Sequence, residues 1–440
     1  MNESFLHYIW QHQYFSKEAL STSEGESIQI NNQGQYNSHA GPDFAEAKIK
    51  IGPIEWAGSV EIHIKASDYL QHKHQHDQAY NNVVLHVVWH NDKPLRRIDG
   101  TAMPTLELRG RVSEGLVKEY RKLVNSAFQI PCSQSFSRIG DLTKVSMIEQ
   151  AAIQRLQAKA NLVRELYKQN QGDWEETFFQ VLAKNFGFKV NADPFLSLAK
   201  ALPIKIIRKN SDSLLKIEAL LFGMAGFLED AKGDAYYLSL KKEFDFLSYK
   251  FSLTGNKMQK AMWRFLRLRP ANFPTLRLAQ MAALLFRSTQ MFTDILTASN
   301  ALQQEARERG QKLTSLRKLF EVEPSFYWSE HFTFGKKSKT IHGRLGEESI
   351  DNLLINSIAP SLAAYSIEKV EEIFLDSALE LLQQLKPEFN NITRSWEELG
   401  LKATNAFDSQ GLIEQMNLFC TKRNCLNCAV GASLLKPVPQ

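Results

Sequence analysis

The sequence predicts an α+β protein in which a small N-terminal α/β domain is followed by a large all-helical domain. Short alternating or continuous apolar runs, typical of strands, fall before residue 110, whereas apolar residues recur at helical spacing from about residue 142 onward. The chain of 440 residues is also too long for one compact core. We therefore expect an α/β domain over 1–130, a helical domain over 131–415, and a C-terminal tail over 416–440 that packs back on the domain boundary.

The N-terminal elements follow from the spacing of their apolar residues. Residues 4–15 carry an apolar stripe at helical spacing, and the alternating stretches 45–51 and 56–65 flank the turn signal Gly52-Pro53, as in a hairpin. The run VVLHVVW at 83–89 is typical of a strand covered on both faces. Three shorter segments complete the domain, namely a strand at 27–30, a strand at 105–109 and a helix at 114–126.

Helical patterns dominate beyond Pro131, and prolines separate them. There is no repeat of fixed period, so a solenoid is not expected. The clearest helices are predicted over 145–169, 175–185, 214–228 and 368–385.

Composition limits the class of protein. The chain is 43% hydrophobic and 23% charged, which is ordinary for a soluble globular protein, and it has no apolar run long enough to span a membrane. The first residues lack the pattern of a signal peptide. Four cysteines are too few for a disulfide scaffold of this size, so we expect a cytoplasmic protein.

Histidines and acids are concentrated near the predicted hairpin. Six of the eleven histidines fall between His63 and His90, and Asp43, Glu61, Asp68 and Asp77 lie in or near the same window. Carboxylates beside strand ends are the ligands that Mg²⁺ or Mn²⁺ prefers, and imidazole favours Mn²⁺ or Zn²⁺. The clustering predicts a divalent-metal site.

The sharpest part of this cluster joins the two hairpin strands. Asp43 directly precedes the first strand, and in the second strand Glu61, His63 and Lys65 share one face because side chains alternate along a strand. We therefore expect Asp43 and Glu61 to hold Mg²⁺ or Mn²⁺, with His63 or Lys65 orienting a water or stabilising the transition state. The alternative is a surface hairpin with an exposed acid.

Gly41-Pro42-Asp43, a gap of seventeen residues and then Glu61-x-His63 resemble the Pro-Asp, gap and (Asp/Glu)-x-Lys pattern of the PD-(D/E)xK nuclease superfamily. The resemblance covers roughly residues 1–125, and the predicted order of helix, strands and helix agrees with that fold. It implies that Asp43 and Glu61 are metal ligands of a nuclease. This chain departs from the pattern by placing a histidine where the family has lysine, and Lys65 lies one pleat further along.

The segment from His72 to Tyr80 adds further candidates. His74 and Asp77 are three residues apart and would share one face of a helix, so we expect them to be auxiliary site residues. The alternative is that residues 72–76 form a solvated loop. His86 alternates with valines inside an apolar strand and is predicted to be a core histidine.

The whole chain also resembles an uncharacterised bacterial family, a domain of unknown function. The stretches that carry this resemblance are NSHAGPDF at 37–44, GSVEIH at 58–63, HQHDQAYNNVVLHVV at 74–88, WRFLRLRPANFPTL at 263–276 and the C-terminal cysteine run. This resemblance brings no established activity.

Three of the four cysteines close the chain as Cys420-x4-Cys425-x2-Cys428, and the fourth, Cys132, follows Pro131. Four thiols form a ligand set for tetrahedral Zn²⁺ or for an iron–sulfur cluster, and the two remain undecided. Such a site would fasten the C-terminus to the N-terminal domain. The alternative is four free, partly buried thiols.

One long segment is strongly basic. Between Leu247 and Thr293 there is no Asp or Glu, whereas eight Lys and Arg residues lie there. A helix that ends before Pro270 would bring arginines together at a helix junction, where their forked guanidinium groups suit phosphates. The alternatives are a solvated helix face and an intramolecular salt-bridge hub. The arginines predicted to bind nucleic acid are Arg264, Arg267, Arg269 and Arg277.

Together these features predict a metal-dependent nuclease acting on nucleic acid, with DNA expected ahead of RNA and no membrane partner. Two alternatives stay open. One is a catalytically silent nucleic-acid-binding or scaffold protein on a degenerate nuclease fold, and the other is a metal-dependent hydrolase of a small phosphoester.

Overall fold

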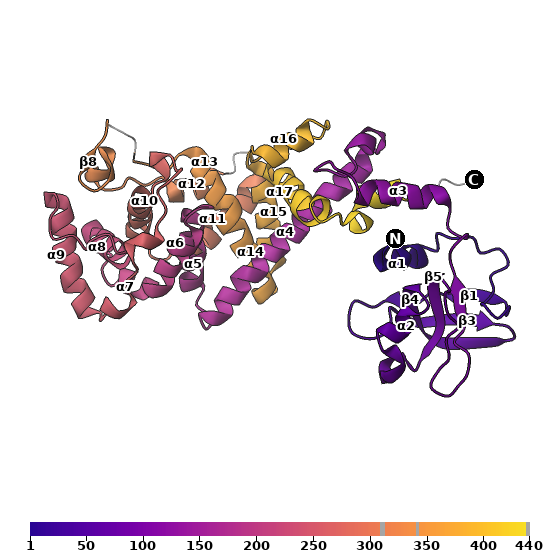
Figure 1. Cartoon of the computed structure of the whole chain (residues 1–440). Coiled ribbons are helices and arrows are strands. Elements are labelled where there is room, and N and C mark those ends of the chain that lie inside the picture. The colour runs from indigo at the N-terminus through magenta and orange to yellow at the C-terminus, as the bar shows by residue number, and fades with distance from the viewer. Residues whose placement is uncertain (309–312, 340–342, 437–440) are drawn as a thin grey trace. The chain divides into compact units, whose positions relative to one another are not determined.

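The computed structural model describes residues 1–308, 313–339 and 343–436, and the chain is an α+β protein as the sequence predicts (Figure 1). It divides into two compact units. Unit 1 comprises residues 1–147 and 415–440 and contains a six-stranded sheet. Unit 2 comprises residues 148–414 and is helical apart from a two-stranded pair. The division falls within the long helix α4 (Asp141–Gln169).

The sheet of unit 1 combines antiparallel and parallel pairs in the order β1-β3-β4-β5-β6, with the short β2 also paired to β3. β3 pairs antiparallel with β1, with β2 and with β4. β5 runs parallel to both β4 and β6. The strands are β1 (Ile28–Asn32), β2 (Gln35–Tyr36), β3 (Phe44–Ile51), β4 (Ile54–Lys65), β5 (Val83–His90) and β6 (Thr105–Glu107).

Helices and short turns cover this sheet. In α1, the side chain of Asn2 accepts a hydrogen bond from the backbone of Phe5 and so caps the first turn. The apolar stripe of α1 is buried, including Trp10, and Cys425 and Leu435 from the C-terminal segment belong to the same core. The elements are α1 (Glu3–His12), α2 (Asp68–Gln71), η1 (His74–His76), η2 (Gln78–Tyr80), α3 (Glu114–Val124), η3 (Ser133–Arg138), η9 (Gln415–Cys420), η10 (Cys425–Asn427) and α18 (Ala429–Leu434).

The first six residues of β5, the apolar run that predicted a doubly covered strand, are all buried. Leu85 and Val87 join the main core, whereas Val83 and Val88 join a smaller cluster that includes Tyr69 of α2. The polypeptide between β4 and β5 therefore folds back over the sheet instead of extending into solvent. This crossover places the histidines of residues 72–76 above the end of β4.

Gly58 is the point at which β4 and β5 approach most tightly. A Cβ atom there would lie 2.5 Å from the carbonyl oxygen of Asn82 and 2.5 Å from Cγ1 of Val84. We expect Gly58→Ala to lower the free energy of unfolding by about 1–3 kcal/mol, because the strands must separate to admit the methyl group. Gly115→Ala in α3, where no atom lies within 4 Å, is the matched control and should be neutral or stabilising. Urea denaturation of both variants tests this, and equal stabilities would contradict it.

Unit 2 has one large apolar core built from most of its helices. The small pair β7 (His331–Thr333) and β8 (Lys336–Lys337) lies at one side of this helical array. The helices and turns of the unit after α4 are α5 (Trp174–Phe186), α6 (Ala192–Ala201), α7 (Ile204–Arg208), α8 (Leu214–Met224), α9 (Ala235–Lys250), η4 (Thr254–Asn256), η5 (Lys260–Met262), η6 (Pro270–Asn272), α10 (Pro274–Arg287), α11 (Met291–Glu308), α12 (Thr314–Phe320), η7 (Phe326–Ser329), α13 (Glu347–Leu353), η8 (Leu354–Ile358), α14 (Ala359–Lys369), α15 (Glu372–Gln384), α16 (Asn391–Glu397) and α17 (Ala406–Glu414).

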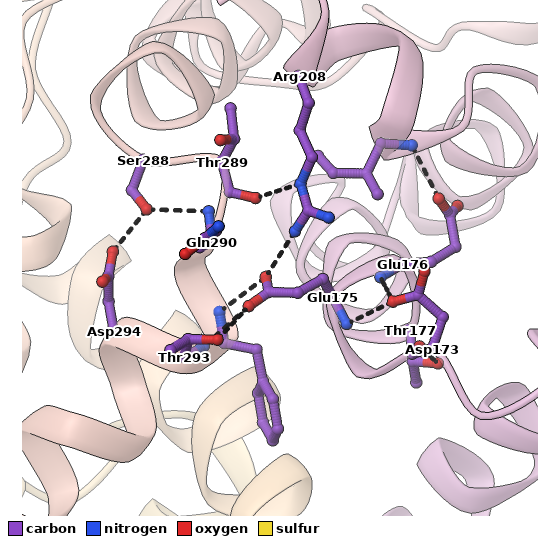
Figure 2. Close-up of polar contacts among 12 residues, drawn as sticks. Asp173, Glu175, Glu176, Thr177, Arg208, Ser288, Thr289, Gln290, Thr293 and Asp294 are labelled. Carbon is purple, nitrogen blue, oxygen red and sulfur yellow. Dashed lines mark hydrogen bonds and ion pairs between the residues drawn. The ribbon is translucent and has the colours of Figure 1, made fainter.

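Carboxylates hold helix ends together within this unit, as Figure 2 shows around Glu175. Glu175 of α5 accepts hydrogen bonds from the backbone N–H groups of Phe292 and Thr293 at 3.1 and 3.0 Å, so it caps the first turn of α11. Arg208 of α7 lies 3.5 Å from the same carboxylate and donates to the carbonyl of Thr289. A negative charge at a helix N-terminus is favourable because unpaired N–H groups point outward there.

One predicted helix is wrong. Residues 263–269 were expected to be helical up to Pro270, but the structure has no regular helix there, and Arg267 adopts a left-handed φ of 65°. The indole of Trp263 is buried and donates to the carbonyl of Ala225, and Asn191 hydrogen bonds to the backbone of Arg264 in both directions. These tertiary bonds replace helical ones. Among the described helices, none is both long and apolar enough to cross a bilayer.

Candidate carboxylate–imidazole site

The two predicted carboxylates meet at the start of the hairpin. The backbone N–H of Asp43 donates to Oε2 of Glu61 at 3.2 Å, and the backbone N–H of Ile62 donates to Oδ2 of Asp43 at 2.9 Å. This reciprocal pair follows from the register, in which Phe44 pairs with Val60. The loop before Asp43 is held by the Asn37 side chain, which donates to the carbonyl of Pro42 at 3.0 Å. Adjacent strand ends thus bring the acids together.

A chain of imidazoles runs beside Glu61. His63 lies on the same face of β4 and is 1% exposed. Its Nδ1 is 3.0 Å from Nε2 of His86 on β5, and its Nε2 is 3.1 Å from Nδ1 of His72, which follows α2. The parallel register pairs Glu61 with His86, which explains how a residue in the next strand reaches His63. His86 therefore contacts the His63 ring from the neighbouring strand.

His74 completes the cluster from the crossover segment. Its Nε2 lies 3.4 Å from Oε1 of Glu61, and its ring stacks on Tyr80 with the ring centres 3.9 Å apart. Ligand atoms of His63, His72 and His74 all lie within 4.8 Å of one another. The Nε2 of His63 is also 3.7 Å from Oε1 of Glu61. Three imidazoles and a carboxylate thus converge on one small volume.

Helix α1 contributes a residue on the other side of the carboxylates. Nε2 of His7 lies 3.3 Å from Oδ2 of Asp43. The side chains of His7 and Asp43 are 16% and 21% exposed, compared with 6% for Glu61 and 2% for His63. The Asp43–His7 pair is therefore more open to solvent than Glu61 and His63, and His72 is exposed as well.

Burial dominates the electrostatics of the site. Burial, reinforced by the nearby Asp43 carboxylate, raises the pKa of Glu61 to about 9. Burial and the surrounding imidazoles lower the pKa of His63 to about 2, burial followed by His74 lowers the pKa of His86 to about 3, and burial lowers the pKa of His74. At neutral pH these three imidazoles are neutral and have lone pairs to offer, and the site as it stands disfavours a second negative charge.

Lys65 and Asp77, which were predicted as catalytic residues, lie at the margin of the cluster. Lys65 is exposed at the end of β4, and its backbone N–H donates to Asp68. Hydrogen bonds from Ser67 lower the pKa of Asp92, and the charge of Lys65 is a smaller cause of the same shift. Asp77 is exposed and accepts from the backbone of Ala79 as the cap of η2. Of the predicted site residues other than the two acids, His63 and His74 are the ones that the fold brings to a carboxylate.

An open cavity of about 340 Å³ lies next to His74. His74 and Tyr80 form part of its wall, and the loop after β5 adds Arg96 and Arg97. Nη2 of Arg97 donates to the carbonyl of Val83 at 2.8 Å, and Nη1 of Arg96 donates to the carbonyl of Gly100 at 2.9 Å. The cavity thus combines a stacked aromatic pair with two cations. No sequence motif marked these arginines.

The predicted phosphate-binding arginines of unit 2 do not form one group. Arg277 is 5% exposed and is buried in α10, where it donates to Gln280, Asn272 and Ser349. This burial does not agree with its assignment to nucleic-acid binding. It is not a solvated residue either, and its hydrogen-bond partners are two side-chain amides and a hydroxyl, so it does not match the salt-bridge alternative. Arg264, Arg267 and Arg269 are exposed, although in an irregular segment and not on a helix.

Sequence reasoning missed part of the cluster. His7 carries no motif and reaches the site only because α1 packs against β4. His72 was considered part of a solvated loop. His86 was predicted to be a core residue, and it is buried, although it also contacts His63. For His72 and His86, the available signal was the abundance of histidines between His63 and His90.

The fold and this site define an α+β protein with a buried carboxylate–imidazole cluster on its sheet unit. The chain belongs to the family described as "Protein of unknown function (DUF2851)", whose model matches residues 3–391. No curated protein and no solved structure matches it. Membership in a family of unknown function is therefore confirmed, whereas the likeness to the PD-(D/E)xK superfamily stays a prediction.

Proposed function

We propose that this protein is a metal-dependent phosphodiesterase that cleaves nucleic acid, with its active centre at Glu61, His63, His72, His74 and Asp43. The observation that carries the proposal is the convergence of three imidazoles and two carboxylates beside a cavity that Arg96 and Arg97 help to line. Two ionised acids held this close together, one of them buried, are unfavourable without a cation, and every side chain in the set is of a kind that binds metals.

The donor set fits Mn²⁺ or Zn²⁺ better than Mg²⁺, because imidazole outnumbers carboxylate. When bound, such an ion polarises a phosphoryl oxygen and lowers the pKa of a bound water. The contact between Nδ1 of His63 and His86 fixes the orientation of the His63 ring, as outer partners of metal-binding histidines do. The more exposed Asp43–His7 pair is placed to accept a proton from an attacking water.

The neighbouring cavity supports a nucleotide substrate. Arg96 and Arg97 supply charge for a phosphate, and the stacked Tyr80 and His74 rings offer a surface for a base. The exposed Arg264, Arg267 and Arg269 remain candidates for further backbone contacts.

The test is cleavage of labelled single- and double-stranded DNA and RNA by the full chain with Mn²⁺, Zn²⁺ or Mg²⁺. We expect cleavage that Mn²⁺ or Zn²⁺ stimulates and that Asp43→Ala abolishes, because the acid pair is broken. Lys65→Ala is the control and should retain most activity, since Lys65 lies at the exposed strand end. Salt-sensitive binding without product under any metal would instead favour the silent scaffold.

A second candidate is a hydrolase of a small phosphoester, which the cavity size favours, since about 340 Å³ lies within the usual range for a small-molecule site. Turnover of a mononucleotide or an aryl phosphodiester, with neither binding nor cleavage of polynucleotides, would establish this reading. Both activities should require Asp43 and Glu61.

A further inference from the structure

The four cysteines of the chain all belong to unit 1, although Cys132 precedes the other three by almost 300 residues. Cys420, Cys425 and Cys428 are buried, and Cys132, which is partly buried, packs against the core that contains Cys425. Burial first, and then the neighbouring thiols, raise the pKa of Cys132 to about 12 and that of Cys425 to about 11. Burial first, and then the other three cysteines, also raise the pKa of Cys420.

The backbone around the cysteines is organised to hold them together. Arg423, between Cys420 and Cys425, has a left-handed φ of 54°. Its Nη2 donates to the carbonyl of Ser126 at 2.8 Å, and its Nη1 donates to the carbonyl of Cys420 at 2.9 Å. The loop that carries the C-terminal trio is thereby fixed to the segment that leads to Cys132.

Hydrogen-bond donors converge on one of these sulfurs. Nε2 of Gln415 donates to Sγ of Cys428 at 3.0 Å, and the backbone N–H groups of Val430 and Gly431 also point to this thiol. The turn needs a glycine, since a Cβ atom on Gly431 would lie 2.0 Å from the carbonyl oxygen of Cys425. Burial raises the pKa of this thiol, and these donors oppose that rise by favouring the thiolate, which is the form that binds metal.

We infer that Cys132, Cys420, Cys425 and Cys428 form a tetrathiolate metal centre that fastens the C-terminal segment to the sheet unit. Deprotonating such buried thiols is unfavourable without a cation, and zinc or an iron–sulfur cluster is the chemistry that matches four sulfurs. Because the centre joins residues almost 300 positions apart, it stabilises unit 1 by closing a very long loop. It is separate from the carboxylate–imidazole site and stands whether or not that site is catalytic.

The experiment is elemental analysis of the full chain purified without oxygen. In the background of His63→Ala/His72→Ala, which removes two imidazoles from the other site, we expect one zinc per chain, or iron with acid-labile sulfide and visible absorption, and its loss when any one of the four cysteines is changed to serine. Lys422→Ala, an exposed neighbour in the same loop, and the double variant His63→Ala/His72→Ala should keep the metal. Zinc and iron–sulfide each support the site and identify its occupant.

X-ray absorption of the His63→Ala/His72→Ala protein, which keeps all four cysteines, keeps the test decisive if the cysteine variants fail to fold. A sulfur-only ligand shell near 2.3 Å is expected for this centre. Protein that is folded without zinc or iron, metal that is retained in the Cys→Ser variants, or a shell dominated by nitrogen would each overturn the inference.

Discussion

Glu61→Gln is expected to reduce metal-dependent cleavage by more than about 100-fold while leaving the protein folded. Changing a residue that only hydrogen bonds to a metal ligand already lowers metal affinity or activity by about 10–100-fold. Glu61 would itself be a ligand, since it lies between His63, His74 and Asp43, where the ion would be bound. An amide is a poor replacement for a carboxylate at a divalent cation. Initial rates at saturating Mn²⁺, measured on the best substrate, test the loss.

The same substitution should not weaken the metal-free fold. Gln keeps the shape of Glu and can still accept from the backbone of Asp43. Because the pKa of Glu61 is raised from 4.5 to about 9, the folded protein holds this proton more tightly than the unfolded chain does. The metal-free wild type should therefore lose stability as pH rises from about 4.5 to 9, and the variant should lack that component of the loss. Urea denaturation at several pH values measures both.

Glu55→Gln is the matched control, since Glu55 lies on the same strand but is exposed and accepts only from the Asn31 side chain among its described bonds. It should leave the cleavage rate and the pH dependence of stability unchanged. Full activity of Glu61→Gln would remove Glu61 from the site, and a parallel loss in both variants would indicate a general effect of charge.

Mn²⁺ affinity is expected to weaken about 50-fold between pH 9 and pH 7. With a pKa of about 9, Glu61 is protonated at pH 7, so the ion must displace one proton, and each pH unit well below 9 costs about tenfold in apparent affinity. His63, His74 and His86 add little to this slope, because burial lowers their pKa values and they are already neutral. Mn²⁺ is the suitable probe because thiolates bind it poorly, which leaves the cysteines silent.

Calorimetry in two buffers of different protonation enthalpy measures the released proton directly. Close to one proton per Mn²⁺ is expected at pH 7 and about half of one at pH 9. In Glu61→Gln, the residual binding should be weak and almost independent of pH. Tight binding at pH 7 without proton release would show that Glu61 is already ionised and that the site is more polar than its burial indicates.

The sequence by itself determined the hairpin and one face of the site. Alternation along residues 56–65 puts Glu61 and His63 on the same side, and Asp43 precedes the partner strand, so their approach needs only local pairing. The apolar run at 83–89 likewise predicts a buried strand without knowledge of its neighbours. Such features depend on periods of two residues and on nearest neighbours in the chain.

The tertiary structure alone decided which other side chains join them. His7 arrives through the packing of α1, His86 through the parallel register of β4 and β5, and His72 through the crossover that folds back over the sheet. The same limit explains Arg277, whose sequence neighbours suggest a phosphate site but whose partners are interior amides and a serine hydroxyl. Contacts between distant segments depend on how whole elements pack, and no local period carries that information.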